Sequence, residues 1–129
     1  MIIKSQLIVV VDDDPSMSQA MQRLLNAAGL PTVAFASAEA LLSSKTAVPA
    51  TGYVFDVQLP GLSGFELHRR LAERGDHTPV VFITAYDHQA SRDLATAQGA
   101  AGYFAKPFAG RELLQALGEA MHIEIPRKP

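Results

Sequence analysis

Apolar residues in this chain gather into five short runs, and the segments between the runs repeat apolar residues every three or four positions. Short continuous runs rich in Val, Ile and Phe are typical of buried strands, whereas a spacing of three or four marks one face of a helix. The predicted strands cover residues 7–11, 32–35, 53–55, 79–84 and 102–105. The predicted helices cover residues 15–28, 37–42, 63–75, 89–98 and 110–121.

Strands and helices alternate along the whole chain, and this order predicts a parallel sheet with helices on both of its faces. Right-handed crossovers and a single switch point leave few strand orders. We therefore predict an α/β fold, a flavodoxin-like, doubly wound, five-stranded parallel sheet with strand order 2-1-3-4-5. We interpret residues 1–122 as this one domain and residues 123–129 as a C-terminal tail or the start of a linker.

Local signals distinguish the helices from one another. Ser63 and Glu66 have the spacing of a capping box, which predicts a well-defined start for the third helix. The fourth helix has a thin apolar stripe, predicted to consist of Ala90, Leu94 and Ala97. Because such a stripe buries little area, we expect the fourth helix to be held weakly against the sheet.

Composition narrows the class of protein. The 129 residues are 48% hydrophobic and 19% charged, which fits one compact domain rather than a disordered chain. The net charge of −2 lacks the basic surplus of a nucleic-acid-binding surface, and the absence of cysteine excludes disulfides and thiolate metal sites. No apolar run reaches membrane-spanning length, and the first run ends in three acids instead of a signal-peptide cleavage site. We expect a cytoplasmic protein without direct contact to nucleic acid or membrane.

Four of the five predicted strands end in a polar residue directly after an apolar run. In the strand order 2-1-3-4-5, the carboxyl ends of strands one, three, four and five meet at the edge where such sheets bind ligands. The polar residues at these ends are Asp12, Asp13, Asp56, Thr84 and Lys106. Three carboxylates, a hydroxyl and an ammonium group at one edge indicate a single site.

Neighbouring carboxylates repel one another, and a hard divalent cation with oxygen ligands relieves that repulsion. We expect Mg²⁺ to be bound by Asp13 and Asp56 together with the backbone carbonyl of Gln58. Asp12 is expected to bind through water or to orient the other ligands.

A metal ion, an ammonium group and a hydroxyl together stabilise the charge that develops in phosphoryl transfer. Lys106 supplies a point charge for a phosphoryl oxygen or for Asp56, and Thr84 can donate a hydrogen bond to a phosphoryl oxygen. Asp56 is the one candidate carboxylate at the centre of the predicted sheet, so we expect it to be the nucleophile.

With these residues the chain resembles the receiver domains of two-component response regulators, of the chemotaxis-regulator type. The matching segments, in the order of that family, are VVVDDD, FDVQLPGLSGFEL, FITAY and GYFAKPF, and the resemblance covers roughly residues 7–121. It implies that Asp56 accepts a phosphoryl group from a phosphohistidine on a partner kinase, with Mg²⁺ as cofactor. It also implies a module that catalyses only its own phosphorylation and dephosphorylation, and not an enzyme acting on other substrates.

The resemblance further implies a switch. Thr84 moves toward the phosphoryl group, Tyr103 turns inward, and the face formed by the fourth helix, fifth strand and fifth helix changes shape. The peptide bond between Lys106 and Pro107 is cis in this family. The implied partners are a sensor histidine kinase or a phosphotransfer protein, and an output domain or protein on the changed face, with a phosphorylation-dependent homodimer left open.

Two loop residues are expected to set the lifetime of the phosphoryl group. Gln58, two residues after Asp56, can orient the attacking water by hydrogen bonding, which speeds hydrolysis. Tyr86, two residues after Thr84, can cover the entrance with its ring, which slows hydrolysis. We expect the shielding by Tyr86 to be the larger effect.

Three other functions fit the sequence less well. The alternative is a metal-dependent, aspartyl-phosphate phosphatase-like enzyme, but such enzymes commonly carry a second acid two residues after the nucleophile, where this chain has Gln58. A nucleotide or flavin binder needs a Gly-rich or Ser/Thr-rich loop after the first strand, where this chain has DDDPS. The intact Asp56 and Lys106 argue against a degenerate scaffold.

The four histidines, at positions 68, 77, 88 and 122, lack metal-ligand spacing and are predicted to lie on the surface.

Overall fold

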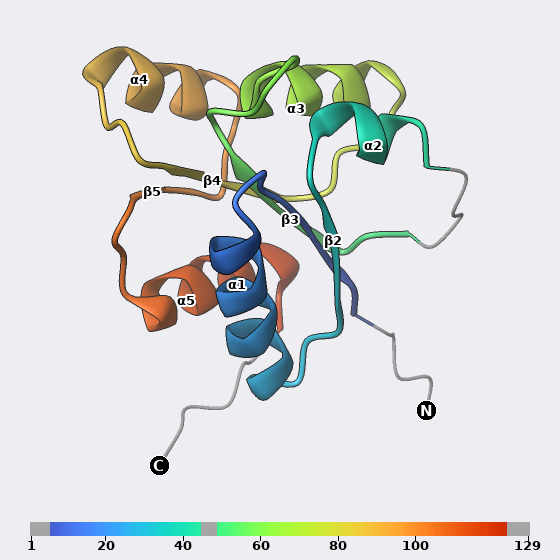
Figure 1. Ribbon diagram of the computed structural model, residues 1–129, viewed down its shortest axis with the longest axis vertical. Coiled ribbons are helices and arrows are strands. Elements are labelled where there is room, and N and C mark those ends of the chain that lie inside the picture. Colours follow the sequence, from blue (N-terminus) through green and yellow to red (C-terminus); the bar gives the residue numbers. More distant parts are fainter. Residues whose placement is uncertain (1–5, 45–48, 124–129) are drawn as a thin grey trace.

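The computed structural model describes residues 6–44 and 49–123, and in them one parallel sheet is flanked by helices on both faces (Figure 1). The strand order is β2-β1-β3-β4-β5, and all neighbouring strands are parallel. The predicted fold class and strand order are therefore confirmed.

The bounds of the elements follow the predicted ones closely. The strands are β1 Ile8–Val11, β2 Thr32–Phe35, β3 Gly52–Asp56, β4 Val80–Thr84 and β5 Gly102–Ala105. The helices are α1 Pro15–Ala27, α2 Ala38–Leu42, α3 Gly64–Glu73, α4 Gln89–Ala97 and α5 Gly110–Met121. None of these helices is long and apolar enough to cross a bilayer. All but the first residue of the tail predicted at 123–129 lie outside the described residues.

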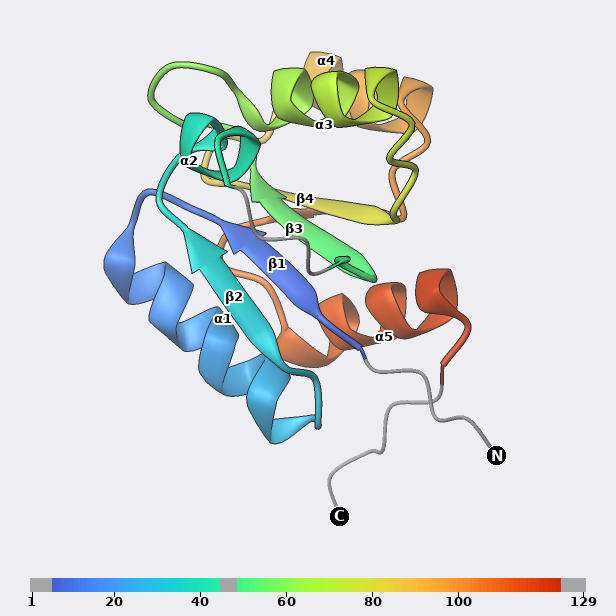
Figure 2. The same cartoon turned by 90° about the vertical axis from the view of Figure 1, so that its right-hand side faces the viewer.

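Two hydrophobic cores hold the layers together. Alternate residues of a strand point to opposite faces of the sheet. In β3, Tyr53 and Phe55 pack into a core under α2, α3 and α4, whereas Val54 packs into a core under α1 and α5 (Figure 2). Because β1, β3 and β4 are buried on both faces, their sequences are continuous apolar runs rather than alternating ones.

Side-chain caps fix where α1 and α3 begin. The Asp14 carboxylate accepts a hydrogen bond from the Ser16 N–H at 3.0 Å and caps α1. The predicted capping box starts α3: the Glu66 N–H donates to Ser63 Oγ at 3.1 Å, and the Ser63 N–H donates to Glu66 Oε1 at 3.2 Å. The loop between Asp56 and α3 is therefore anchored at its α3 end by the capping box, and at its β3 end the Val57 N–H donates to the Ile83 carbonyl at 2.8 Å.

The predicted inward stripe of α4 is wrong. Ala90, Leu94 and Ala97 are exposed, Leu94 by 38%, and the buried residue of the helix is Ala95. α4 carries so few large apolar residues that its hydrophobic pattern does not determine which side faces the sheet. The helix still buries little apolar area, as expected from its composition, although it does so through a different side.

His68 is also misplaced by the sequence-based prediction, because it is half-buried rather than on the surface. It follows the buried Leu67 on the inner side of α3, and its ring stands edge-on to Phe82 with centroids 5.7 Å apart. Its Nδ1 lies 3.1 Å from Oε1 of Gln98, the residue after α4, so it joins α3 to α4. The other three histidines are exposed as predicted.

Candidate functional site

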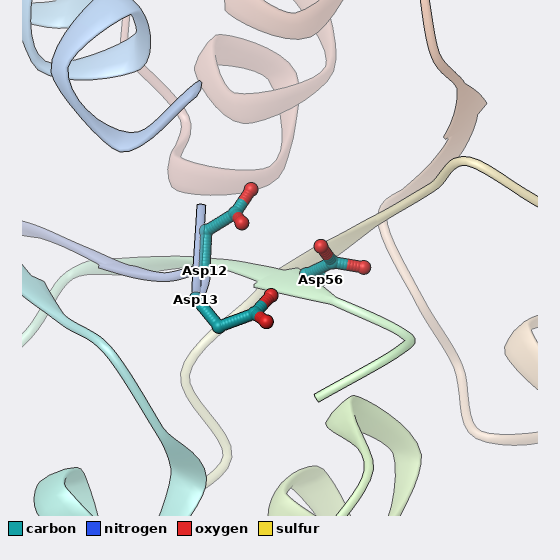
Figure 3. A group of neighbouring side chains, drawn as sticks. All are labelled: Asp12, Asp13 and Asp56. Atoms are coloured by element: carbon teal, nitrogen blue, oxygen red, sulfur yellow. The ribbon is translucent and has the colours of Figure 1, made fainter. Parts of the chain in front are cut away.

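The ends of β1 and β3 bring three carboxylates together. Val11 pairs with Phe55 across these strands, so Asp12 and Asp56 follow at neighbouring positions. Oxygen atoms of Asp12, Asp13 and Asp56 lie within 4.8 Å of one another, and Figure 3 shows the three carboxylates around one space. Among the described residues, this is the one group of three acidic or histidine side chains placed to hold a metal ion. Asp12 and Asp56 are buried, whereas Asp13 is exposed.

Lys106 places its ammonium group against two of these carboxylates. Its Nζ lies 3.0 Å from Asp56 Oδ2 and 3.3 Å from Asp12 Oδ2. Lys106 directly follows β5, and its backbone N–H donates to the carbonyl oxygen of Thr84 at 2.7 Å, which ties the end of β5 to the end of β4. The peptide bond between Lys106 and Pro107 is cis.

The charged groups of this cluster shift one another's pKa values. Burial raises the pKa of the Asp56 carboxyl and the charge of Asp12 adds to the effect, while the Lys106 ammonium and the Gln58 N–H act against it. Burial acts to lower the pKa of Lys106, but the hydrogen bonds and charges of Asp56 and Asp12 together outweigh burial, and the pKa is raised. Lys106 is therefore cationic at neutral pH and is the main group that stabilises the ionised form of Asp56.

The hydroxyl of Thr84 is fully buried at the end of β4 and is surrounded by loop residues. It lies 2.7 Å from Gln58 Oε1 and 3.0 Å from the carbonyl oxygen of Tyr86, and it accepts the Tyr86 N–H at 3.0 Å. The Gln58 N–H donates to Asp56 Oδ1 at 3.0 Å. The loops after β3 and β4 therefore meet at the Thr84 hydroxyl.

Tyr103 lies half-buried on β5 and bonds to the α4 side of the molecule. Its hydroxyl donates to Asp87 Oδ1 at 3.2 Å, and Arg92 of α4 pairs with the same carboxylate, with Nε 2.8 Å from Oδ1. These three residues help to line an open groove of about 520 Å³ that extends to the start of α5. Thr84 thus lies at the same edge of the sheet as the three carboxylates, whereas Tyr103 lies in a separate cluster with Asp87 and Arg92.

Comparison with known proteins identifies this arrangement. Residues 8–118 match the response regulator receiver domain family. The chain belongs to this family. It is 36% identical over 122 residues to nodulation protein W of Bradyrhizobium diazoefficiens, an alignment that covers 95% of this chain and 54% of that protein. It is 31% identical over 125 residues to response regulator protein TmoT of Ectopseudomonas mendocina, covering 97% of this chain and 57% of that protein.

Solved structures agree with the family match. A response regulator receiver protein from Burkholderia phymatum superposes with a TM-score of 0.82 at 36% identity, and the match covers 95% of this chain and all of that one. The receiver described here spans about half the length of the curated relatives it matches. Receiver domains are regulatory signalling modules and the phosphorylatable switches of two-component systems.

Receiver domains generally bind Mg²⁺ at an acidic pocket, and the residues of this chain fit that ion. Mg²⁺ takes one or two carboxylates and completes its shell with waters and phosphate oxygens. The cluster supplies carboxylate oxygens alone, two of its members are buried beside a cation, and exposed Asp13 leaves a side open to water.

One contact at the site could not be seen in the sequence. Leu62 lies in the loop that leads from Asp56 to α3, and its N–H donates a hydrogen bond at 2.9 Å to Oε2 of Glu39 in α2. Hydrogen bonding to that N–H lowers the pKa of Glu39. The adjacent Gly61 has φ +77°, and a Cβ there would lie 2.3 Å from Glu39 Oε2. The contact joins positions 23 residues apart, and only the Pro-Gly turn signal at residues 60–61 hints at a constrained backbone.

Proposed function

We propose that Asp56 is the phospho-acceptor of this receiver and takes its phosphoryl group from a phosphohistidine on a sensor histidine kinase or a phosphotransfer protein. The observation that carries the proposal is the setting of the Asp56 carboxylate, which is 5% exposed at the centre of the sheet with Lys106 Nζ at 3.0 Å. A carboxylate oxygen attacks phosphorus, the P–N bond to the histidine breaks with its electrons returning to the imidazole, and an aspartyl phosphate forms.

The residues around Asp56 would stabilise the charge of this transfer in two ways, by holding a metal ion and by supplying an ammonium group. Asp13, Asp56 and the backbone carbonyl of Gln58 would hold Mg²⁺, with Asp12 bound through water or orienting the others. When bound, the ion would supply positive charge that neutralises phosphoryl oxygens. Lys106 keeps Asp56 ionised for attack and then neutralises charge on the transferred group.

Thr84 connects the acceptor to the face formed by α4, β5 and α5. A phosphoryl oxygen on Asp56 attracts the Thr84 hydroxyl, which must then leave its contacts with Gln58 and Tyr86. The loop after β4, which also carries Asp87, is released, and Tyr103 loses its hydrogen-bond partner and turns inward. α4 buries little apolar area and is the element best able to shift. An output domain, a protein partner or a second copy of the chain would read the changed face.

Gln58 and Tyr86 are proposed to set the lifetime of the aspartyl phosphate. Gln58 reaches Asp56 through its backbone, and Tyr86 follows Thr84 on a loop where its side chain is 63% exposed. An exposed ring can lie over the entrance without leaving a packed position, so Tyr86→Ala should shorten the lifetime more than Gln58→Ala changes it.

The phosphatase-like alternative finds no acid in the structure at the required place. Position 58 carries an amide whose Oε1 lies 2.7 Å from the Thr84 hydroxyl as an acceptor, and an amide does not act as a general acid. Turnover of external phosphate esters is therefore not part of the proposal.

Incubation with acetyl phosphate and Mg²⁺, followed by intact-protein mass spectrometry, tests the acceptor. The wild-type chain should gain one phosphoryl group, and removal of Mg²⁺ with a chelator should suppress the gain. Asp56→Asn should gain none, while the exposed matched control Asp93→Asn should behave as wild type. A full gain in Asp56→Asn would show that the acceptor lies elsewhere.

A further inference from the structure

The Thr84 hydroxyl lies within hydrogen-bond distance of two acceptors but has only one proton to donate. Gln58 Oε1 at 2.7 Å and the Tyr86 carbonyl at 3.0 Å are both acceptors, and the shorter distance favours Gln58. The Tyr86 N–H, also at 3.0 Å, occupies one lone pair of the hydroxyl oxygen. Thr84 has no exposed surface, so water does not compete for this proton.

We propose that the Gln58 side chain is a positioning residue that holds the Thr84 hydroxyl in the resting receiver and competes with the phosphoryl group for it. The proposal rests on the proposed role of Asp56 as acceptor. A hydroxyl proton donated to Gln58 cannot be donated to a phosphoryl oxygen, so capture of Thr84 must first break the Gln58 bond. Gln58 thus sets how readily phosphorylation engages the switch, which differs from the orientation of hydrolytic water.

We call the hydrogen bond between the Gln58 side chain and the Thr84 hydroxyl the latch, and the position of Gln58 suits this role. Its backbone N–H donates to Asp56 Oδ1 at 3.0 Å, so one residue is bonded to the acceptor through its backbone and to the switch residue through its side chain. The other Asp56 oxygen, Oδ2, is bonded to Lys106. A phosphoryl group on Asp56 therefore forms beside the residue that restrains Thr84.

Loss of the Gln58 amide should leave the resting fold satisfied. The Tyr86 carbonyl at 3.0 Å remains as an acceptor for the Thr84 hydroxyl, so no buried donor is left without a partner. The backbone of residue 58 is also retained, so neither its N–H bond to Asp56 nor the carbonyl proposed to bind Mg²⁺ depends on the side chain.

The test is a titration with beryllofluoride, a phosphoryl mimic, in saturating Mg²⁺. Binding is followed by the NMR shift of the Tyr86 amide, which donates to the Thr84 oxygen. Gln58→Met keeps side-chain length without the amide oxygen and should bind the mimic roughly three- to tenfold more tightly than wild type, because the 2.7 Å bond to Gln58 is replaced by the longer and weaker one to the Tyr86 carbonyl.

A mutant cycle separates the latch from a general loosening of the loop. In a Thr84→Val background, Gln58→Met should leave the affinity for beryllofluoride unchanged, whereas in Thr84→Ser, which keeps a hydroxyl, it should again tighten binding. Unchanged or weaker binding in Gln58→Met, or an equal gain in the Thr84→Val background, would overturn the latch. Failure of the wild-type chain to bind the mimic would instead overturn the acceptor role of Asp56, and the latch with it.

Discussion

Lys106 is the residue on which the charge balance of the site depends. It is bonded to both buried carboxylates of the cluster, at 3.0 Å to Asp56 and 3.3 Å to Asp12. Without that cation, less would offset the effect of burial and of the Asp12 charge on the pKa of Asp56, and the ionised form of Asp56 would become less favourable. The same ammonium group also repels a metal ion at the cluster.

Lys106→Ala should therefore change function and metal binding in opposite directions. We expect phosphorylation by acetyl phosphate to slow by about tenfold or more, which corresponds to about 1.4 kcal/mol in the barrier, while Mg²⁺ binds more tightly. The unfolding midpoint in Mg²⁺ should stay close to that of wild type, and Lys106→Arg should restore part of the rate. Weaker Mg²⁺ binding in Lys106→Ala would contradict this view of the charge balance.

Asp76 carries a pH dependence at the other end of β3. Burial acts to raise its pKa, but hydrogen bonds from the Tyr53 hydroxyl and from Thr78 outweigh burial and lower the pKa below its ordinary value of 3.8. The Thr78 hydroxyl and N–H donate at 2.7 and 3.1 Å. Because the pKa is lower in the folded protein, Asp76 stabilises the fold above pH 3.8, and that contribution is lost as the pH falls through the folded value.

Asp76→Asn should reduce the free energy of unfolding by about 1 kcal/mol at pH 7. It should also flatten the fall in stability as the pH drops below 3.8, because Asn has no carboxyl group whose protonation destabilises the folded state. Urea unfolding across this pH range provides the measurement, and Tyr53→Phe, which removes one donor, should have a smaller effect of the same kind. A variant that parallels wild type over the whole range would show that Asp76 is not responsible.

At the scale of the elements, the loop between β3 and α3 is restrained from outside as well as by its own ends. The Glu39 carboxylate of α2 accepts the Leu62 N–H at 2.9 Å and occupies the space beside Gly61. Gly61 therefore meets two requirements, a positive φ of +77° and the room taken by Glu39. This contact extends the support of the acceptor loop to a helix that contributes no residue to the acidic cluster.

Gly61→Ala and Gly75→Ala form a matched pair. Both residues have positive φ, +77° and +85°, but a Cβ at Gly75 meets nothing within 4 Å. Gly75→Ala should cost about 1–2 kcal/mol from the backbone alone. Gly61→Ala should cost more than Gly75→Ala, because Glu39 must leave Leu62.

Chemical unfolding of these variants gives the comparison. Adding Glu39→Ala should have no further effect in the Gly61→Ala background, although it lowers the stability of wild type. If the Gly61 and Gly75 variants lose the same free energy, the Glu39 contact contributes nothing to stability.

At the scale of the whole molecule, the sequence determined the sheet and the meeting of the strand ends. β1, β3 and β4 are buried on both faces and so appear as unbroken apolar runs, and the topology then brings Asp12, Asp56 and Thr84 to one edge. The side of α4 that faces the sheet could not be predicted, because alanines give almost no directional preference. The Gln58–Thr84 and Glu39–Leu62 contacts depend on side-chain conformations in separate loops, which no spacing in the sequence encodes.

The chain spans about half the length of its curated relatives. We propose that an output domain or protein partner reads the signal at the face of α4, β5 and α5. Asp87, Arg92 and Tyr103 form the polar cluster on that face and lie outside the acidic pocket. In the proposed switch, the signal passes from Asp56 to this cluster through Thr84 and the loop that follows it. Each step of this proposed switch starts from a phosphoryl group on Asp56.

The most direct measurement locates the phosphoryl group on the chain. After incubation with acetyl phosphate and Mg²⁺, reduction with borohydride converts an aspartyl phosphate into homoserine, and peptide sequencing by mass spectrometry then identifies the modified position. We predict homoserine at position 56 and none at positions 12 or 13. Homoserine at either of those positions with an unmodified Asp56, or a phosphoryl group that survives reduction on a hydroxyl side chain, would contradict the account.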